Sequence, residues 1–175
     1  MIESELLYLT PISKEDTQLF VEIYTDPQVM QFVGPVLNKD KALKLFKQCV
    51  NQVAKQHPQY LFYVINSKHS SEKFGIVGLL WNQQSQKSIE LGVMIAKTYI
   101  NKAYAFKALK LLVKYVFMKF NVQEVVMICE ESNTAASRIS KGLGFRKKEI
   151  FVDKKTKQRK IIWQKTVKIF GDIKK

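Results

Sequence analysis

The chain has 175 residues, 46% of them apolar, and its 29 Lys and Arg outnumber its 15 Asp and Glu, giving a formal net charge of +14 at pH 7. This composition predicts one globular domain over residues 1–175, and the absence of a long apolar run argues against a membrane-spanning protein. A surface so basic favours polyanionic partners such as RNA, an acidic protein or a phosphorylated small molecule. Because the lysines are spread along the chain, a compositional habit of the source explains them equally well.

The N-terminal segment and the cysteines both indicate the cytoplasm. MIESELLYL carries acidic residues where a secretion signal would be basic, so export is not expected. Cys49 and Cys129 do not form a C-x-x-C pair, which favours buried thiols in a reducing compartment over a disulfide. His57 and His69 have no partners at ligand spacing, so the sequence predicts no metal site.

The first third of the chain predicts a strand followed by helices. Ser13 and Asp16 form a capping-box pattern, and Asn38 precedes apolar residues that recur at three- and four-residue steps. The predicted elements are a strand over 5–10, a helix over 14–24, a short helical segment that begins at Asp26-Pro27, and a helix from Asn38 to His57-Pro58.

The remainder predicts a mixed sheet. Strands over 60–66, 74–81 and 88–96 are joined by short polar turns, which implies an antiparallel meander. The run VVMIC within 122–130 suggests a strand buried on both faces. The other predicted elements are helices over 104–120 and 134–143 and a hairpin of strands 145–152 and 159–167. The only parallel crossovers then flank the stretch 88–110.

Within that stretch, the loop 97–104 joins a strand to a helix and contains no acidic residue. The amides at a helix start, together with the positive end of the helix dipole, suit a phosphate group. Asn101 is a residue type that tolerates a left-handed conformation, so it could turn the chain there. An ordinary strand-to-helix turn fits the same composition.

The order of elements, together with IELGVMI, INKAYAFKALKLLVKYVF and ESNTAASRISKGLGF, resembles the GNAT superfamily of acetyl-CoA-dependent N-acetyltransferases. LYLTPISKED, YTDPQVMQFVGP and FGIVGLLWN are similar to its ribosomal-protein N-terminal acetyltransferase (RimJ/RimL-type) branch. This resemblance covers nearly the whole chain. It implies an α/β single-domain GNAT fold, with a mixed, mostly antiparallel sheet splayed between the fourth and fifth predicted strands and helices on both faces.

The resemblance also implies acetyl-CoA as co-substrate. The family's phosphate loop has Gln or Arg, two residues, Gly, one residue, then Gly or Ala; here Thr98 and Asn101 depart from that pattern and Ala103 conforms. Backbone amides at a strand bulge would hold the pantetheine and polarise the thioester. Asn133 would bind the pantetheine arm, cap the following helix, or do both. The implied cofactor-binding residues are Val93, Met94, Ile95, Ile100, Asn101, Lys102, Ala103, Tyr104, Ala105, Asn133 and Ser137.

For catalysis, Glu90 is the acid on the strand that would meet the thioester, so it could serve as general base through a water; a surface glutamate is the alternative. Ser140 stands where many relatives place a tyrosine acid, with Ser137 as a second candidate. By analogy with the branch, Phe32, Val33 and Trp81 would line the acceptor pocket, although each also suits ordinary core packing.

The sequence therefore predicts an N-acetyltransferase that moves acetyl directly to a primary amine in a ternary complex. The acceptor would be a protein N-terminus, on an acidic or RNA-rich assembly, or a small amine. The alternative function is a catalytically weak GNAT-fold module that binds RNA or the ribosome through its basic surface. We expect no membrane partner, and a monomer or homodimer.

Overall fold

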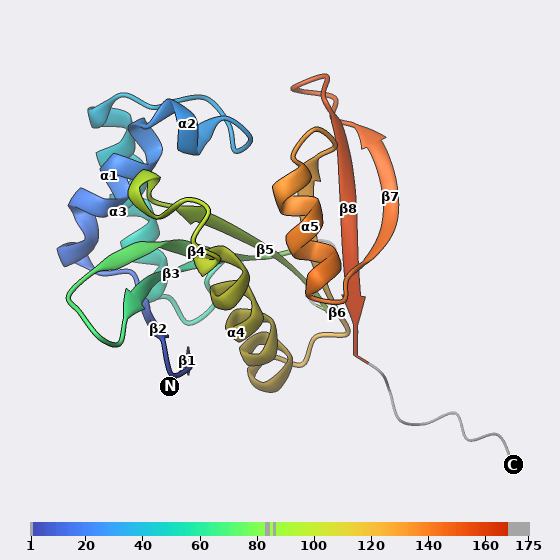
Figure 1. Cartoon of the computed structure of the whole chain (residues 1–175), viewed down its shortest axis with the longest axis horizontal. Helices are drawn as coiled ribbons and strands as arrows, with labels where there is room; N and C mark the ends of the chain where they lie inside the picture. The colour runs from blue at the N-terminus through green and yellow to red at the C-terminus, as the bar shows by residue number, and fades with distance from the viewer. Residues whose placement is uncertain (1, 83–84, 86, 168–175) are drawn as a thin grey trace, which may run out of the picture.

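The computed structural model describes residues 2–82, 85 and 87–167. Within them, eight strands form one sheet in the order β1-β2-β3-β4-β5-β6-β8-β7 (Figure 1). The strands are β1 (Ile2–Glu3), β2 (Leu7–Pro11), β3 (Tyr60–Ser67), β4 (Lys73–Trp81), β5 (Ser88–Ile95), β6 (Glu124–Glu130), β7 (Arg146–Val152) and β8 (Arg159–Thr166). The helices are η1 (Lys14–Asp16), α1 (Thr17–Thr25), α2 (Pro27–Met30), α3 (Lys39–Val53), η2 (Lys97–Tyr99), α4 (Tyr104–Lys119) and α5 (Thr134–Gly142).

A fork between β5 and β6 is the feature of the sheet that positions the site. These two strands form the parallel pair, and they are the fourth and fifth strands of the prediction. Their pairing covers only Ser88↔Glu124 through Glu90↔Val126, after which β6 follows β8 instead. The structure thus confirms a mixed, mostly antiparallel sheet that splays at the predicted place.

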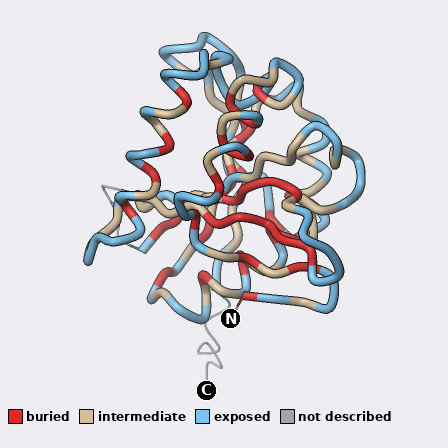
Figure 2. The backbone as a smooth tube through the Cα atoms, turned by 90° about the vertical axis from the view of Figure 1, so that its left-hand side faces the viewer, coloured by how far each residue is buried: buried red, intermediate tan, exposed pale blue. Residues whose placement is uncertain are grey.

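Helices cover both faces of the sheet, as predicted. On one face, α1 and α3 pack on the side chains of Val64 and Ile76 in a core that includes Phe20 and Phe46. On the other face, α4 and α5 pack over a larger core that includes Leu109 and Leu112. Figure 2 shows the buried stretches running along the central strands. Apolar burial on two faces fixes the sheet from which the fork opens.

The predicted helix starts are confirmed by their caps. Asp16 Oδ2 accepts a hydrogen bond from the Ser13 amide at 2.8 Å, which completes the capping box. Asp26 accepts from two amides at the start of α2, and Asn38 Oδ1 accepts from the Lys41 amide at 2.9 Å. These side chains satisfy helix donors that would otherwise lack partners.

Several boundaries differ from the prediction. The strand predicted over 5–10 is β2, and a short strand, β1, that was not predicted precedes it. Ser4 turns the chain between the two, with its amide donating to the Leu7 carbonyl at 2.8 Å. α3 ends at Val53, before His57-Pro58, where the Gln52 side chain accepts from the Gln59 amide. The predicted turn 82–87 lies partly outside the described residues.

β6 is not buried on both faces as VVMIC suggested. Its residues alternate between buried and half-buried, so Val125 and Met127 lie in the core while Val126 and Ile128 are partly exposed. The reason is that α1–α3 cover only part of their face of the sheet, which leaves this side of β6 open. Among the described helices, none is both long and apolar enough to cross a bilayer.

Candidate functional site

A cavity of about 690 Å³ passes through the fork between β5 and β6. Its lining residues come from both the α5 side and the α1–α3 side of the sheet. Its lining comes from α1, α3, α5, the segment after α2, and five strands. The lining includes Tyr24, Phe32, Val33, Gln48, Cys49, Tyr60, Phe62, Gly78, Leu80, Glu90, Gly92, Val93, Met94, Cys129, Glu130, Asn133, Ala136, Ser140 and Lys160.

Glu90 stands at the point where the fork opens, since Glu90↔Val126 is the last pair of the β5–β6 ladder. By strand alternation it shares a face with Gly92 and Met94, and all three line the cavity. Burial raises the pKa of the Glu90 carboxyl, while the positive charge of Lys160 lowers it in opposition. A half-buried carboxylate of raised pKa can accept a proton from an amine or from a water beside it.

The backbone of β5 faces the fork with alternate amides. The Ala96 amide donates to the Phe74 carbonyl of β4 at 2.9 Å, and donors alternate sides along a strand, so the Val93 and Ile95 amides point away from β4. On that side of β5, pairing with β6 has already ended. The Met94 amide faces β4, although its side chain lines the cavity. Two N–H groups are therefore directed into the gap, where an oxyanion or a pantetheine carbonyl could accept them.

The bulge expected in β5 is absent from the described ladder. β4 and β5 pair without a register shift from Gly75↔Ile95 to Trp81↔Ile89. The shift instead occurs between Ile65 and Asn66 of β3. The prediction of a bulge was wrong, because the departure of β6 alone is enough to expose the amides of β5.

The loop before α4 has two residues with left-handed backbones. Asn101 has a φ of 67°, as predicted for its turn, and Ala103 has a φ of 61°. Ala103 makes no side-chain cap, and the first turn of α4 has no acidic residue, within the part of the chain that the structure describes. The Lys107 amide makes the first helical bond, to the Ala103 carbonyl at 3.2 Å. In the turn before the helix, the Ile100 and Lys102 amides donate to the Lys97 and Tyr99 carbonyls. The amides that stay open for an anion are therefore those of residues 103–106, ahead of the first helical bond.

The neighbouring side chains of this loop are tied to the β3–β4 turn. Tyr99 donates from its hydroxyl to Glu72 Oε1 at 2.9 Å, and Lys102 Nζ lies 5.3 Å from the centre of the Tyr99 ring. Ile100, Lys102, Tyr104 and the other predicted loop residues do not line the cavity. They lie beyond the end of β5, outside the part of the site where the fork opens.

α5 brings three predicted residues to the cavity side of the sheet. Asn133 accepts from the Ala136 amide at 2.9 Å as helix cap, and it lines the cavity. Ser140 is fully buried, lines the cavity, and donates its hydroxyl to the Ala136 carbonyl at 2.9 Å. Ser137 lies outside the lining, with its Oγ 3.8 Å from the sulfur of Cys129.

The predicted acceptor residues separate into two groups. Phe32 and Val33 line the cavity with Glu90, whereas Trp81 packs edge-on against Phe120 and lines a second cavity of about 410 Å³. The two cavities share Leu80, Glu90 and Ile128, so Glu90 borders both.

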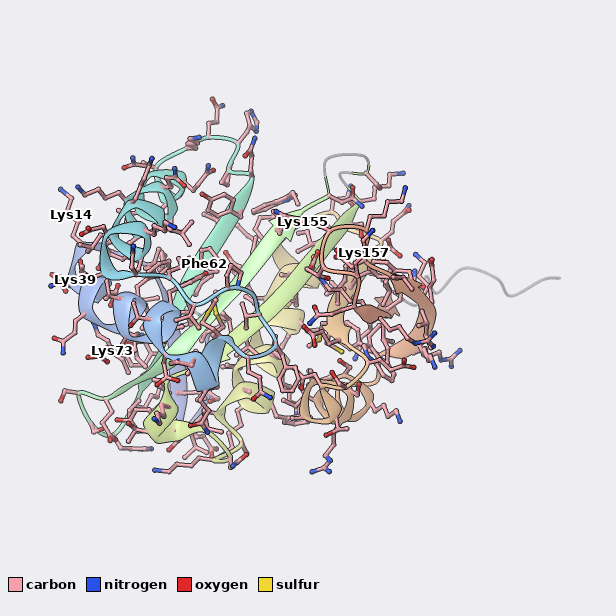
Figure 3. The ribbon with its side chains drawn as sticks, turned by 90° about the horizontal axis from the view of Figure 1, so that it is seen from above. Lys14, Lys39, Phe62, Lys73, Lys155 and Lys157 are labelled. Atoms are coloured by element: carbon pink, nitrogen blue, oxygen red, sulfur yellow. The ribbon has the colours of Figure 1, made fainter. Side chains whose placement is uncertain are left out.

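Sequence reasoning missed much of the far wall of the main cavity. Tyr24, Gln48, Tyr60, Phe62 and Lys160 come from α1, α3, β3 and β8, and no local motif marks them. The available signal was the helical period of α3, which places position 48 near the half-buried position 45 and the buried position 49. Figure 3 shows Phe62 between the N-terminal helices and the loop that carries Lys155 and Lys157.

The cysteines are free and buried, as predicted. Burial raises the pKa of the Cys49 thiol to about 12, so this thiol stays protonated although it lines the cavity. Among the described residues, no three His, Cys, Asp or Glu side chains gather where they could hold a metal ion.

The sequence matches a family model described as an acetyltransferase (GNAT) domain over residues 7–146. It is similar to two curated relatives. The uncharacterized N-acetyltransferase p20 of Bacillus licheniformis is 23% identical over 152 residues, which cover 86% of this chain and 84% of the relative. The uncharacterized N-acetyltransferase YnaD of Bacillus subtilis is 21% identical over 160 residues, covering 86% and 85%.

Solved structures share the fold of this chain. A GNAT-family acetyltransferase from Bacillus anthracis has a TM-score of 0.81 at 16% identity and covers 94% of this chain and 96% of its own. RimL, a ribosomal alpha-N-protein acetyltransferase in complex with coenzyme A, has a TM-score of 0.80 at 12% identity. The match covers 93% of this chain and 95% of RimL. A spermidine N-acetyltransferase from Vibrio cholerae, in complex with CoA and spermine, has a TM-score of 0.79 at 15% identity. The match covers 93% of this chain and 96% of that enzyme. They confirm the predicted fold class without singling out one branch.

Proposed function

Because the chain belongs to the GNAT acetyltransferase family, we propose that it transfers the acetyl group of acetyl-CoA directly to a primary amine within a ternary complex. The observation that carries this proposal is the cavity through the β5–β6 fork, which has Glu90 at its opening and β5 amides on one edge. Such a passage lets a thioester reach an amine from the opposite side of the sheet.

The residues around the fork suit acetyl-CoA. The open amides of 103–105 at the start of α4 would hold the pyrophosphate, with Lys102 supplying positive charge. The pantetheine arm would lie between β5 and β6, where Val93 and Ile95 present N–H groups and the Asn133 side chain lies close to the opening. The departures at Thr98 and Asn101 leave the backbone donors in place, since these donors depend on backbone direction rather than on side chains.

In the transfer step, the neutral amine attacks the thioester carbonyl carbon, a C–N bond forms and the C–S bond breaks. The amine proton passes to Glu90, directly or through one water, and coenzyme A leaves as a thiolate that then takes a proton from water. The N–H groups of Val93 and Ile95 stabilise the oxyanion that develops on the carbonyl oxygen. An α-amine, with a pKa near 8, is already partly neutral at neutral pH, so a weak base suffices.

Ser140 is our candidate for the donor to the departing sulfur. Its hydroxyl lines the cavity but donates to the Ala136 carbonyl, so the hydroxyl would have to rotate before it could donate to sulfur. A serine is a weak acid, and its contribution is therefore a hydrogen bond rather than full proton transfer. Ser137, farther from the cavity, is the second candidate.

The acceptor is a protein N-terminus or a small-molecule amine. RimL and the Vibrio cholerae spermidine enzyme are fold relatives whose names cover both kinds. We place the chain with the ribosomal-protein branch because of its sequence resemblance. The +14 charge favours acceptors on an acidic or RNA-rich assembly, and free buried thiols suit the reducing cytoplasm.

A two-stage experiment tests this proposal. Acetyl-CoA should raise the melting temperature of the protein, because a ligand that binds only the folded state stabilises it. Thiol release in the presence of peptides and amines should then report turnover. The enzyme proposal is wrong if acetyl-CoA leaves the melting temperature unchanged while RNA raises it, a result that would identify a binding module.

A further inference from the structure

The half of the cavity on the α1–α3 side of the sheet has a distinct, aromatic chemistry. Tyr24 from α1, Phe32 from the segment after α2, and Tyr60 and Phe62 from β3 all line it. Three of the rings are held by ring contacts: Phe62 packs against Tyr60 with centroids 5.9 Å apart, and Tyr24 stacks on Phe20 at 4.3 Å, while Phe32 is exposed. This wall is therefore preformed rather than assembled by the acceptor.

Two glycines form the floor of this half of the cavity, and one of them leaves it open. Gly78 and Gly92 are cross-strand partners on β4 and β5, and Phe62 is the partner of Gly78 on the other side. A Cβ on Gly78 would come within 2.7 Å of the Phe62 ring, so that ring lies directly over the glycine. A Cβ on Gly92 would meet nothing within 4 Å. We call the space above Gly92, between the Phe62 ring and the fork, the glycine slot.

Charge is confined to the fork end of the slot. Of the described residues that line the cavity, Glu90 and Glu130 are the carboxylates, and both lie on the two strands of the fork. The positive charge of Lys160 acts on the Glu90 carboxyl, and it would repel a second ammonium group of an acceptor. On the opposite wall the aromatic rings are accompanied by the amide of Gln48. A second ammonium group placed there would lose its hydration without gaining a carboxylate partner.

We propose that the acceptor is a primary amine on a single apolar or aromatic arm, with no second positive charge within the length of the glycine slot. This inference rests on the proposed acetyl transfer. The amine would lie beside Glu90 and its arm over Gly92, against Phe62 and Tyr60. A free arylalkylamine and a protein N-terminus with an apolar first residue share this chemistry, whereas a polyamine does not.

The test compares acceptors in a thiol-release assay after acetyl-CoA binding has been measured by calorimetry. The probes are phenethylamine, spermidine, and two C-terminally amidated tetrapeptides that differ only in a Phe or Lys first residue. We expect kcat/KM for phenethylamine or the Phe peptide to exceed that for spermidine and the Lys peptide by about 100-fold or more, because a buried unpaired charge is strongly rejected. The faster of the two favoured probes shows whether the apolar arm belongs to a free amine or to a protein N-terminus.

Variants tie the preference to the slot. Gly92→Ala should lower kcat/KM for the favoured acceptor by about tenfold with unchanged melting temperature, since its methyl group fills open space. Gly34→Ala, at another glycine with nothing within 4 Å and outside the lining, should have no effect. Gln48→Glu should narrow the discrimination against spermidine by about tenfold, whereas Asn51→Asp, on α3 but outside the lining, should not.

The outcomes distinguish a failure of the proposed acetyl transfer from a failure of the apolar-arm proposal. Failure of acetyl-CoA to bind would remove the proposed function itself. With acetyl-CoA bound, equal or faster turnover of spermidine, or no turnover of either apolar probe, would overturn the apolar-arm inference. Loss of turnover in Gly34→Ala as large as in Gly92→Ala would also overturn it.

Discussion

At the scale of single residues, Glu90 links activity and stability in opposite directions. Its pKa is raised by burial, so the ionised carboxylate costs folding free energy while it makes a better base. Glu90→Gln should lower kcat by about 100-fold, the usual contribution of a general base, with acetyl-CoA affinity unchanged. Thiol-release assays measure kcat, and calorimetry measures the affinity for acetyl-CoA.

The same variant should raise the melting temperature. A carboxyl whose folded pKa lies above its unfolded value contributes stability that is full below the unfolded pKa and is lost as pH rises through the folded pKa. The gain from Glu90→Gln should therefore be larger at pH 8 than at pH 4.5. The matched control is Glu130→Gln, at a cavity carboxylate on the facing strand. A lower melting temperature in Glu90→Gln at pH 8 would contradict this account.

Lys160 should set the pH at which activity is lost on acidification. Its positive charge opposes the raised pKa of Glu90, so Lys160→Met should shift the acid limb of the kcat profile to higher pH. Lys160 Nζ also pairs with Asp153 Oδ2 at 2.8 Å. Asp153→Asn breaks that pair and keeps the lysine charge, so its profile should match the wild type. Equal shifts in both variants would assign the effect to loop structure.

Individual residues also show how far the sequence could predict this site. Glu90 could be placed at the fork because strand alternation and the resemblance agreed on its position. Tyr24, Gln48 and Phe62 could not, because they belong to elements whose periodic pattern reports burial and not the direction of a cavity. Trp81 shows the opposite limit: it was predicted near the acceptor, yet it lines the second cavity instead.

At the scale of elements, the start of α4 depends on the left-handed turn at Asn101. Asparagine tolerates a positive φ of 67°, whereas alanine at the same φ costs about 1 kcal/mol. Asn101→Ala should therefore weaken acetyl-CoA binding about fivefold, and Asn101→Gly should bind at least as tightly as the wild type. Calorimetric titration distinguishes them. Equal affinities for the Ala and Gly variants would show that loop strain does not limit cofactor binding.

The fork illustrates what element-level reasoning achieves. The order of elements predicted the parallel crossovers around 88–110, and the family resemblance implied the splay between β5 and β6. The ladder then stops at Glu90↔Val126, as described. The bulge in β5 that the same resemblance implied does not occur, because strand registers depend on single hydrogen bonds that a sequence pattern does not encode. The amides of Val93 and Ile95 reach the gap without one.

The whole molecule determines where the cavity lies, because its walls come from both ends of the chain. Residues 24 and 160 both line it, and no window of sequence contains both. The packing of α1 and α3 on one side of the sheet leaves the rest of that face open beside the fork. This arrangement follows from tertiary packing, which explains why the aromatic wall was absent from the sequence-based prediction.

Net charge acts at the same scale and gives the last prediction. A field from +14 should draw anionic acetyl-CoA toward the protein, and salt should screen it with a Debye length of about 10 Å at 0.1 M. We expect kcat/KM for acetyl-CoA to fall roughly threefold to tenfold between about 20 mM and about 300 mM salt. At saturating acetyl-CoA, kcat/KM for a monoamine should stay level or rise with salt instead of falling, because the protonated amine is repelled by the same field. A flat salt profile for acetyl-CoA would show that the lysines reflect composition rather than steering, and would leave the local donors of α4 as the source of cofactor affinity.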